Sequence, residues 1–258
     1  MRFSSLGSGS DGNALVVEGS EGSTTTRVLL DCGFSMREAV RRLERAALTP
    51  DQLQGILITH EHSDHIGGAL SLARKTGLPV YMSWGTALAT RAVDAKVDLR
   101  IIEAGEALRI GDLDVHPYTV PHDAREPLQF TFSDGARRLG VLTDVGIGTP
   151  HIVETLSRCD ALILECNHDR EMLSNGRYPP MLKARIGGSH GHLANDAAAE
   201  ILAALAHGAL RHVVAAHLSA ENNQAGLAQA ALAGALGAHA GDILVASQAD
   251  GFDWLSIA

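Results

Sequence analysis

One segment, Thr59-His60-Glu61-His62-Ser63-Asp64-His65-Ile66-Gly67-Gly68, constrains this chain more than any other. It places three imidazoles and the Asp64 carboxylate within six residues, directly after an apolar run at residues 55–59 that predicts a buried strand. His60 and His62 are two residues apart, so in an extended or turn conformation their side chains point the same way, whereas on a helix they would diverge. Asp64 and His65 fall where the next helix would begin. Because imidazole and carboxylate ligands suit Zn²⁺, Mn²⁺ or Fe, the segment predicts a metal site at a strand end.

The further ligands that a metal site needs are available elsewhere in the chain. Three polar residues each end another apolar run, which is where loops gather functional groups on a rigid scaffold. Taken singly, each histidine among them is more often structural, but beside the first cluster each becomes a predicted ligand. These residues are His122 after residues 113–120, Asp144 after residues 139–143, and His217 after residues 213–216.

Short apolar runs alternate with helical patterns, and no linker divides the sequence, which favours one α/β domain over residues 1–258. Strands are predicted at residues 28–30, 55–59, 79–82, 113–118, 128–132, 138–143, 161–165, 212–216 and 243–246. Helices are predicted at residues 35–47, at 195–207 with Asn195 as N-cap, and at 222–236.

A weak internal repeat joins the two halves of the chain. Leu30-Asp31-Cys32-Gly33 is followed by a helix and a strand at 56–59, and Thr143-Asp144-Val145-Gly146 is followed by a helix and a strand at 162–165. Such a repeat implies two similar sheet layers facing each other, with helices outside and polar loops gathered at one edge.

Composition excludes several classes of protein. The chain has 258 residues, of which 45% are hydrophobic and 20% charged, so it is neither disordered nor fibrous. A net charge of −9 argues against a protein that coats nucleic acid with its whole surface. Three cysteines, Cys32, Cys159 and Cys166, are too few for a disulfide scaffold, so a reducing cytoplasm is expected. No apolar run approaches the ~18 residues of a membrane span, and neither export nor membrane anchoring is expected.

A local basic stretch points to an anionic substrate. Residues 172–192 contain no Asp or Glu but carry Arg177, Lys183 and Arg185, and they lead into His190 and His192. Beside a metal centre this stretch would attract phosphate, although a solvated charged face is the alternative. Arg125 and Arg170 would add to it. The Gly- and Ser-rich residues 4–13 either offer backbone N–H groups to phosphate or form a turn between two strands.

The motif at His60 to His65, with His122, Asp144 and His217, resembles the HxHxDH signature and later ligand positions of the metallo-β-lactamase fold superfamily. The resemblance implies a four-layer αββα sandwich, two mixed β-sheets flanked by helices, that binds two divalent metal ions. Because Asp144 replaces a cysteine and His65 ends the motif, the chain is more similar to the dinuclear hydrolases than to the antibiotic-degrading enzymes. The implied ligands are His60, His62 and His122 for one ion, Asp64, His65 and His217 for the other, and Asp144 as a bridge.

Four further segments, at residues 4–13, 165–169, 191–195 and 217–223, resemble the YycJ/WalJ-like group of this superfamily. That group is associated with 5′→3′ exonuclease activity on double-stranded DNA, so the resemblance implies DNA as the substrate. Cys166 and Ala194 stand where the group is expected to have serine. Neither residue is a predicted ligand, so the difference bears on substrate detail.

We therefore hypothesise a phosphodiesterase or nuclease in which two ions, Zn²⁺ or Mn²⁺ with Fe as a further option, hold a bridging hydroxide that attacks phosphorus. Asp64 would orient the nucleophile, and His192, with His190 as second choice, would protonate the leaving oxygen. Arg177, Lys183 and Arg185 would bind substrate. Asn222 and Asn223 either orient a ligand or begin the last helix, and His168 would support a metal ligand.

Two other functions remain open from the sequence. The same metals would serve a small-molecule hydrolase, such as a glyoxalase II-like thioesterase, a lactonase or a cyclic phosphodiesterase. A non-catalytic protein is disfavoured because every expected ligand position is filled. No long insertion supplies a clamp-like extra domain, so binding of nucleic acid is expected to depend on the core domain, on a partner or on an oligomer such as a homodimer.

Overall fold

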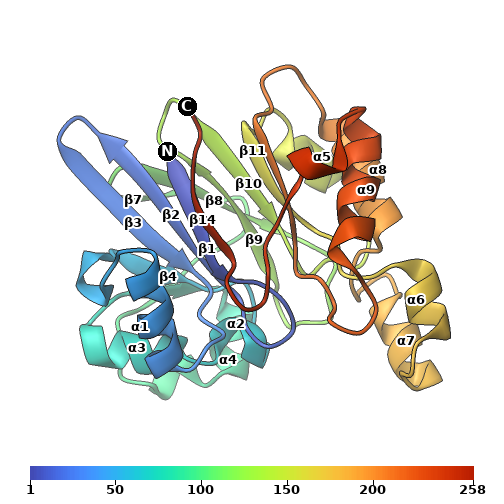
Figure 1. Ribbon diagram of the computed structural model, residues 1–258. Helices are drawn as coiled ribbons and strands as arrows, with labels where there is room; N and C mark the ends of the chain where they lie inside the picture. The colour runs from blue at the N-terminus through green and yellow to red at the C-terminus, as the bar shows by residue number, and fades with distance from the viewer.

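The computed structural model describes residues 1–258, which fold into four layers with two β-sheets in the middle and helices on both outer faces (Figure 1). Each sheet has seven strands, in the order β14-β1-β2-β3-β4-β5-β6 and β13-β12-β11-β10-β9-β8-β7. The predicted αββα sandwich with mixed sheets is thereby confirmed.

Within each sheet, neighbouring strands run parallel on one side and antiparallel on the other. β3 to β6 are parallel to one another, as are β10 to β13. The first sheet consists of β1 (Arg2–Gly7), β2 (Ala14–Glu21), β3 (Thr24–Leu30), β4 (Gly55–Leu57), β5 (Val80–Met82), β6 (Leu99–Ile101) and β14 (Phe252–Ser256). The second consists of β7 (Leu108–Ile110), β8 (Leu113–Thr119), β9 (Leu128–Ser133), β10 (Arg138–Leu142), β11 (Ala161–Glu165), β12 (His212–Ala216) and β13 (Leu244–Val245).

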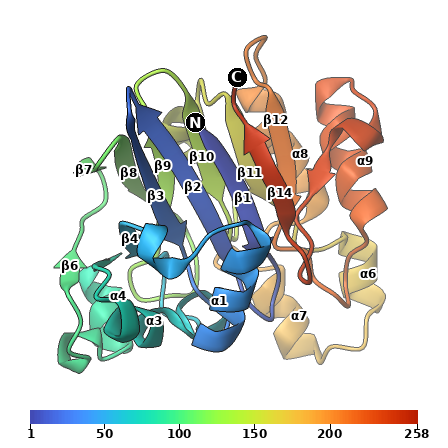
Figure 2. The same ribbon diagram turned by 60° about the vertical axis from the view of Figure 1, so that its left-hand side comes forward.

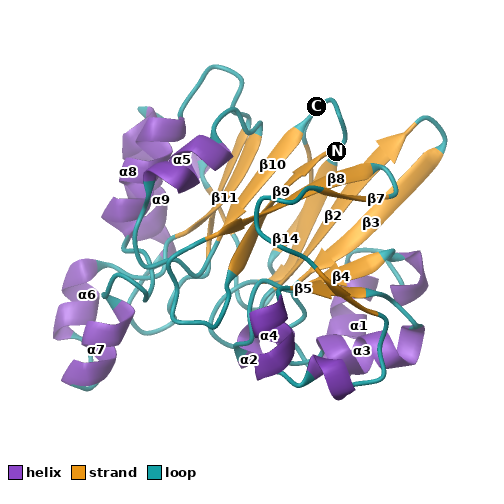
Figure 3. Ribbon diagram, turned by 180° about the vertical axis from the view of Figure 1, so that it is seen from behind, coloured by secondary structure: helices purple, strands orange, loops and turns teal.

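The helices divide between the two outer layers and one end of the sandwich (Figure 2). The first sheet is covered by α1 (Met36–Arg45), α3 (Ala69–Thr76) and α4 (Trp84–Ala89), with α2 (Ser63–Ile66) at its lower edge (Figure 3). The second is covered by α5 (Pro150–Leu156), α8 (Asn195–Leu205) and α9 (Ala225–Leu236). The short helices α6 (Arg170–Asn175) and α7 (Pro180–Ile186) form a hairpin beyond the sheets, and three 3₁₀ turns lie at Pro50–Gln52, Ala92–Asp94 and Ala240–Asp242.

Three apolar clusters hold these layers together. The first fills the space between the sheets and includes Phe3, Phe130 and Phe132, each with no exposed surface. Burial of one such aromatic side chain contributes about 1.5–3 kcal/mol. The second cluster lies between the second sheet and its helices, and the third between the first sheet and its helices. The sheets are therefore a rigid base for the loops at their edges.

The internal repeat is present in three dimensions. β3-α1-β4 and β10-α5-β11 have the same order of elements, and each strand pair is parallel. Asp31 and Asp144, which follow β3 and β10, both adopt left-handed backbone conformations, with φ of 59° and 54°. A Cβ on Gly33 would lie 1.8 Å from the Asp64 carbonyl oxygen, and one on Gly146 2.2 Å from the Ser189 carbonyl carbon, so both glycines permit close backbone approach.

Several local predictions differ from the structure. Asn195 is the first residue of α8, not its N-cap, because its side chain instead pairs with Asn223 at 2.9 Å. The last helix begins at Ala225, and Asn222 and Asn223 precede it as buried loop residues. The Gly- and Ser-rich residues 4–13 complete β1 and form the turn into β2.

The backbone of that turn is already bonded to the protein. The N–H groups of residues 7, 8, 9, 11, 12 and 13 all donate to protein oxygens, so of the two alternatives the structure has the turn between strands and not the phosphate-binding loop. None of the helices is both long and apolar enough to cross a membrane.

Candidate metal centre and active site

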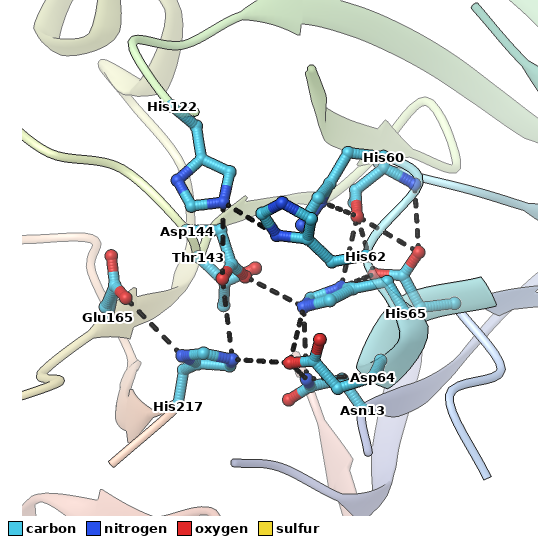
Figure 4. A network of polar contacts seen from close by, with 12 residues as sticks. Asn13, His60, His62, Asp64, His65, His122, Thr143, Asp144, Glu165 and His217 are labelled. Carbon is cyan, nitrogen blue, oxygen red and sulfur yellow. Dashed lines mark hydrogen bonds and ion pairs between the residues drawn. The ribbon is translucent and has the colours of Figure 1, made fainter. Parts of the chain in front are cut away.

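The predicted ligands come together at the edge where the carboxyl ends of the central parallel strands of both sheets meet (Figure 4). His60 is the third residue after β4, and His62, Asp64 and His65 follow within the turn and α2. His122, Asp144 and His217 come from the ends of β8, β10 and β12 in the second sheet. The sheet order brings together residues that are far apart in the sequence.

Two triads emerge from this arrangement. His60, His62 and His122 have ligand atoms within 4.8 Å of one another, and so do Asp64, His65 and His217. Asp144 lies between the triads: its Oδ2 is 3.1 Å from His65 Nε2, and its Oδ1 is 3.5 Å from His217 Nε2 and 3.9 Å from His122 Nε2. Asp144 is therefore within reach of histidines from both triads.

Four of the five imidazoles are held through Nδ1, which leaves Nε2 directed at the ligand cluster; His62 has no such partner, and its Nδ1 faces His122 Nε2 at 3.3 Å. His60 Nδ1 lies 3.0 Å from Thr59 Oγ1, and His122 Nδ1 lies 3.0 Å from the Gly191 carbonyl oxygen. His65 Nδ1 lies 2.8 Å from the Asp31 carboxylate, and His217 Nδ1 lies 3.4 Å from Glu165 Oε1. Such contacts fix both the tautomer and the ring orientation of a metal-ligating histidine.

The donor set fits divalent metals in its unsatisfied atoms as well. His60 Nε2 and Asp144 Oδ2 are buried and have no hydrogen-bond partner in the protein. Because Asp31 fixes the proton of His65 on Nδ1, the unprotonated Nε2 of this ring faces the oxygens of Asp144 and Asp64 at 3.1 and 3.4 Å. Acceptors that face one another at such distances in a buried site need a cation or added protons between them.

The pKa values of the site also indicate that its buried groups need a cation or added protons between them. Burial opposes a charge on His217, yet Asp144, Asp64 and Glu165 together raise the pKa of this imidazole to about 10. Burial would raise the pKa of Asp64, but His217 and His65 hold it well below its usual range. Burial is the largest cause that lowers the pKa of His60. Carboxylates that stay ionised and imidazoles that attract protons are groups ready to exchange those protons for metal.

A second pair of groups stands at the side of the ligand cluster. His192 Nδ1 lies 2.7 Å from Glu165 Oε1, and its ring stacks on that of His217 with centroids 5.4 Å apart. Although burial lowers the pKa of His192, the Glu165 carboxylate raises it above the usual value. The predicted acid therefore has a carboxylate partner and a free Nε2. His190 is exposed, with its ring beside Ser189 Oγ at 3.1 Å, and the structure does not bring it into the cluster.

Three site residues were missed by the sequence analysis. Asp31 orients His65, Glu165 contacts both His192 and His217, and the Asn13 side-chain amide lies 3.1 Å from His65 Nε2 and 3.3 Å from Asp64 Oδ2. The internal repeat was a signal for Asp31, since it matched Asp31 with Asp144. A charged residue ending the apolar run at residues 161–165 was a signal for Glu165.

The cleft above the ligands has a volume of about 350 Å³. Of the three predicted basic contacts, only Arg185 lines it, and its Nε lies 2.5 Å from Asp123 Oδ2. Lys183 donates to the Ser174 carbonyl oxygen within the α6–α7 hairpin, and Arg177 is exposed away from the cleft lining. Tyr178 also lines the cleft, so the hairpin forms one of its walls.

The other predicted contacts lie around the site without entering its cleft. Asn222 and Asn223 are buried, and Asn223 donates to the Cys166 carbonyl oxygen at 2.7 Å, so both pack between loops. Arg170 pairs with Asp196 at 2.6 Å. Arg125 is exposed, and its backbone N–H donates to Glu61.

His168 does not support a ligand as predicted. Its Nδ1 is buried without a hydrogen-bond partner, and its side chain lines a separate cavity.

Comparison with known proteins agrees with this geometry. The profile of the Beta-lactamase superfamily domain matches residues 26–218, which is most of the chain and contains the whole ligand set. This chain belongs to the metallo-β-lactamase superfamily. It is 36% identical to exodeoxyribonuclease YycJ of Bacillus anthracis over 232 residues, covering 89% of this chain and 86% of the relative. It is 35% identical to exodeoxyribonuclease WalJ of Streptococcus pneumoniae over 227 residues, covering 86% and 83%.

Solved structures of the metallo-β-lactamase superfamily share the fold. The metallo-β-lactamase fold protein YhfI of Bacillus subtilis superimposes on this chain with a TM-score of 0.76 at 16% identity, over 99% of both chains. The predicted membership in the YycJ/WalJ-like group and the fold class are confirmed, and the chain is a metal-dependent hydrolase of this superfamily.

Proposed function

We propose that this hydrolase is a 5′→3′ exonuclease that cleaves phosphodiesters of double-stranded DNA with two divalent metal ions, Zn²⁺ or Mn²⁺. The observation that carries the proposal is the pair of ligand triads around Asp144, flanked on one side by the His192–Glu165 pair. Similarity over most of the chain to relatives named exodeoxyribonucleases supports DNA as the substrate.

The metal ligands divide as the geometry suggests. One ion would be held by His60, His62 and His122, the other by Asp64, His65 and His217, with Asp144 shared between them. When bound, the ions would supply an activated water at neutral pH and neutralise charge on the phosphoryl oxygens.

The chain's own residues supply the rest of the chemistry. Asp64, positioned by Asn13, presents a carboxylate that accepts a hydrogen bond and orients the attacking water. His192 gives the proton of its Nε2 to the leaving oxygen, because its Nδ1 is engaged by the Glu165 carboxylate, which raises the pKa of the ring and so favours its protonated form. An acid so placed contributes about 10²–10⁴-fold to the rate.

Arg185 is the basic contact that we assign to the substrate phosphate. Its guanidinium pairs with Asp123, whose Oδ1 lies 3.5 Å from His122 Nε2, so it stands at the rim of the ligand cluster. Arginine suits phosphate oxygens because its planar fork forms two parallel hydrogen bonds. A phosphodiester in the cleft would compete with Asp123 for this guanidinium.

Digestion of an end-labelled duplex with added Mn²⁺ or Zn²⁺ tests the proposal. Release of labelled mononucleotides from the 5′ end is expected, with hydrolysis of bis(p-nitrophenyl) phosphate and none of a glutathione thioester. Cleavage of the thioester alone would instead support the small-molecule hydrolase.

Substitutions separate the roles of the residues. Asp144→Asn and His62→Ala are expected to lose bound metal and turnover together, whereas His192→Ala keeps the metal and loses rate. His116→Ala, on an exposed part of β8, serves as the matched histidine control. Full activity in Asp144→Asn would overturn the two-ion assignment.

A further inference from the structure

A second cavity begins where the active-site cleft ends. It has a volume of about 760 Å³ and is lined by His192, which also lines the cleft above the metal ligands. Pockets that hold small ligands measure ~300–1,000 Å³, so this cavity is large enough for one. The acid of the proposed reaction therefore stands between the metal ligands on one side and an open cavity on the other.

The lining of this cavity is more suited to a heterocycle than to an anion. Its walls include the apolar side chains of Ile147, Val153, Ala197 and Ile201, and Ile147 is 47% exposed. Of the charged groups that line it, Glu154 and Glu200 have no ion-pair partner, whereas Arg170 is already paired with Asp196. A phosphate would meet net negative charge here, but an uncharged planar ring with polar edges would not.

One polar side chain in the lining lacks a partner. His168 is only 2% exposed, and its Nδ1 forms no hydrogen bond with any other group. A buried polar group left unsatisfied is unfavourable, so it is normally paired in the functional state. The cavity has room for water or a bound molecule that would form a hydrogen bond with His168 Nδ1.

The direction of the reaction determines which part of the substrate would enter. In hydrolysis of a phosphodiester, a P–O bond forms to water and the P–O bond to the leaving group breaks, with the proton of His192 passing to the leaving oxygen. The leaving group therefore lies next to His192 and points away from the metal ligands, where the cavity begins. If the broken bond is the one to O3′, the leaving group is the nucleotide released from the 5′ end.

We propose that this cavity is the binding site for the nucleoside that carries the leaving oxygen, with its base between the apolar walls and near His168. The assignment rests on the proposed nuclease function, which it extends from phosphodiester cleavage to recognition of the terminal residue. A site of this size accepts one nucleoside, which favours cleavage one residue from an end.

Binding of deoxyadenosine tests the cavity without any turnover. Saturation-transfer NMR on the metal-loaded enzyme is expected to show contacts to the base protons. Ala197→Phe, on α8, and Val153→Phe, on α5, fill the cavity from two elements and should abolish these contacts. Ala203→Phe places the same ring on the exposed side of α8 and should preserve them. Absence of contacts in the parent enzyme, or their persistence in both cavity variants, would overturn the assignment.

Activity on DNA separates this proposal from the nuclease function itself. In the cavity variants, kcat/KM on a 5′-phosphorylated duplex is expected to fall about tenfold or more, because a buried anchor contact is lost. Metal content and thermal unfolding should match those of Ala203→Phe. An enzyme that binds deoxyadenosine but leaves DNA intact would refute the nuclease function and with it the leaving-group role of the cavity, although the cavity would remain a nucleoside-binding site. Unchanged cleavage of DNA by both folded cavity variants would refute the cavity assignment alone.

Discussion

Glu165 offers the sharpest test of how the site works, because it is fully buried and each of its two oxygens has a distinct task. Oε2 accepts the backbone N–H groups of Val145 at 2.9 Å and Leu193 at 3.3 Å. Oε1 faces Nδ1 of His192 at 2.7 Å and Nδ1 of His217 at 3.4 Å. Burial would raise the pKa of this carboxyl, but His192 lowers it to about 2, so the group is ionised at neutral pH.

Glu165→Gln keeps the shape of the side chain and removes its charge. The two backbone N–H groups require an oxygen, so the amide NH₂ must take the place of Oε1 and point at His192 Nδ1. His192 then becomes a neutral ring with its proton on Nε2, which is a weaker acid than an imidazolium. A hydrogen bond to a charged group contributes about 1.5–3 kcal/mol, and each 1.36 kcal/mol is a factor of ten in rate. The expected loss of kcat on DNA is therefore about 10- to 150-fold.

The choice of substrate distinguishes this chemical effect from simple damage. Bis(p-nitrophenyl) phosphate has a leaving group that is stable as an anion, so its hydrolysis needs little help from an acid, and Glu165→Gln should slow it much less than DNA cleavage. Saturating metal corrects for any weaker binding at His217. Glu44→Gln, an exposed position on α1, is the matched control. Full activity of Glu165→Gln on DNA, or equal losses on both substrates with metal retained, would refute the assignment of His192 and Glu165.

Three further predictions concern metal and substrate binding. Asp31→Asn should weaken metal binding about 10- to 100-fold, measured by competition with a metal indicator, because the Asp31 carboxylate orients the ligand His65. The exposed control Asp51→Asn should bind metal as the parent does. Equal affinities of the two variants would contradict this role of Asp31. Although burial disfavours the charged imidazole, neighbouring carboxylates raise the pKa of His217 to about 10, so the metal-free protein carries a proton there at pH 7 that metal must displace. Metal affinity should therefore rise with pH up to about 10, by up to about tenfold per unit, with proton release in calorimetry; a pH-independent affinity would refute the reasoning. Arg185→Ala should lower kcat/KM on DNA at low salt and lower it less at high salt. The exposed control Arg211→Ala should leave kcat/KM unchanged at both salt concentrations. A loss in Arg185→Ala that does not depend on salt would argue against a phosphate contact.

The metal ligands could be predicted because their chemistry is local. His60, His62, Asp64 and His65 are adjacent in the sequence, and no packing role explains three imidazoles after one buried strand. His122 and the other distant ligands follow from the rule that loops at strand ends carry function. The four-layer fold followed from the family resemblance and, more weakly, from the repeat of strand, Asp-x-Gly, helix and strand.

Other features depend on contacts that no local pattern encodes. β1 and β14 pair across almost the whole chain, as in the hydrogen bond from Ser4 Oγ to the Phe252 carbonyl oxygen, 248 residues apart. The roles of Asp31 and Glu165 require knowing which histidine each will meet, and that is set by the order of strands in the sheets. The basic residues 177, 183 and 185 have the same charge in sequence, but the turn of the α6–α7 hairpin directs only Arg185 to the cleft.

The backbone at the site explains why the same strand ends recur as functional positions. Asp31 and His217 directly follow β3 and β12, and Asp144 follows β10 after one intervening residue. All three have left-handed conformations with φ between 54° and 59°. A non-glycine residue held in this region costs about 1–3 kcal/mol and persists only where the surrounding structure determines it. In each case the chain turns at the point where the strand ends, which carries the side chain to the sheet edge instead of a sheet face. Asp31 and Asp144 thus occupy equivalent positions in the two halves of the molecule, but their roles differ. Asp31 orients the ligand His65, whereas Asp144 lies between both triads.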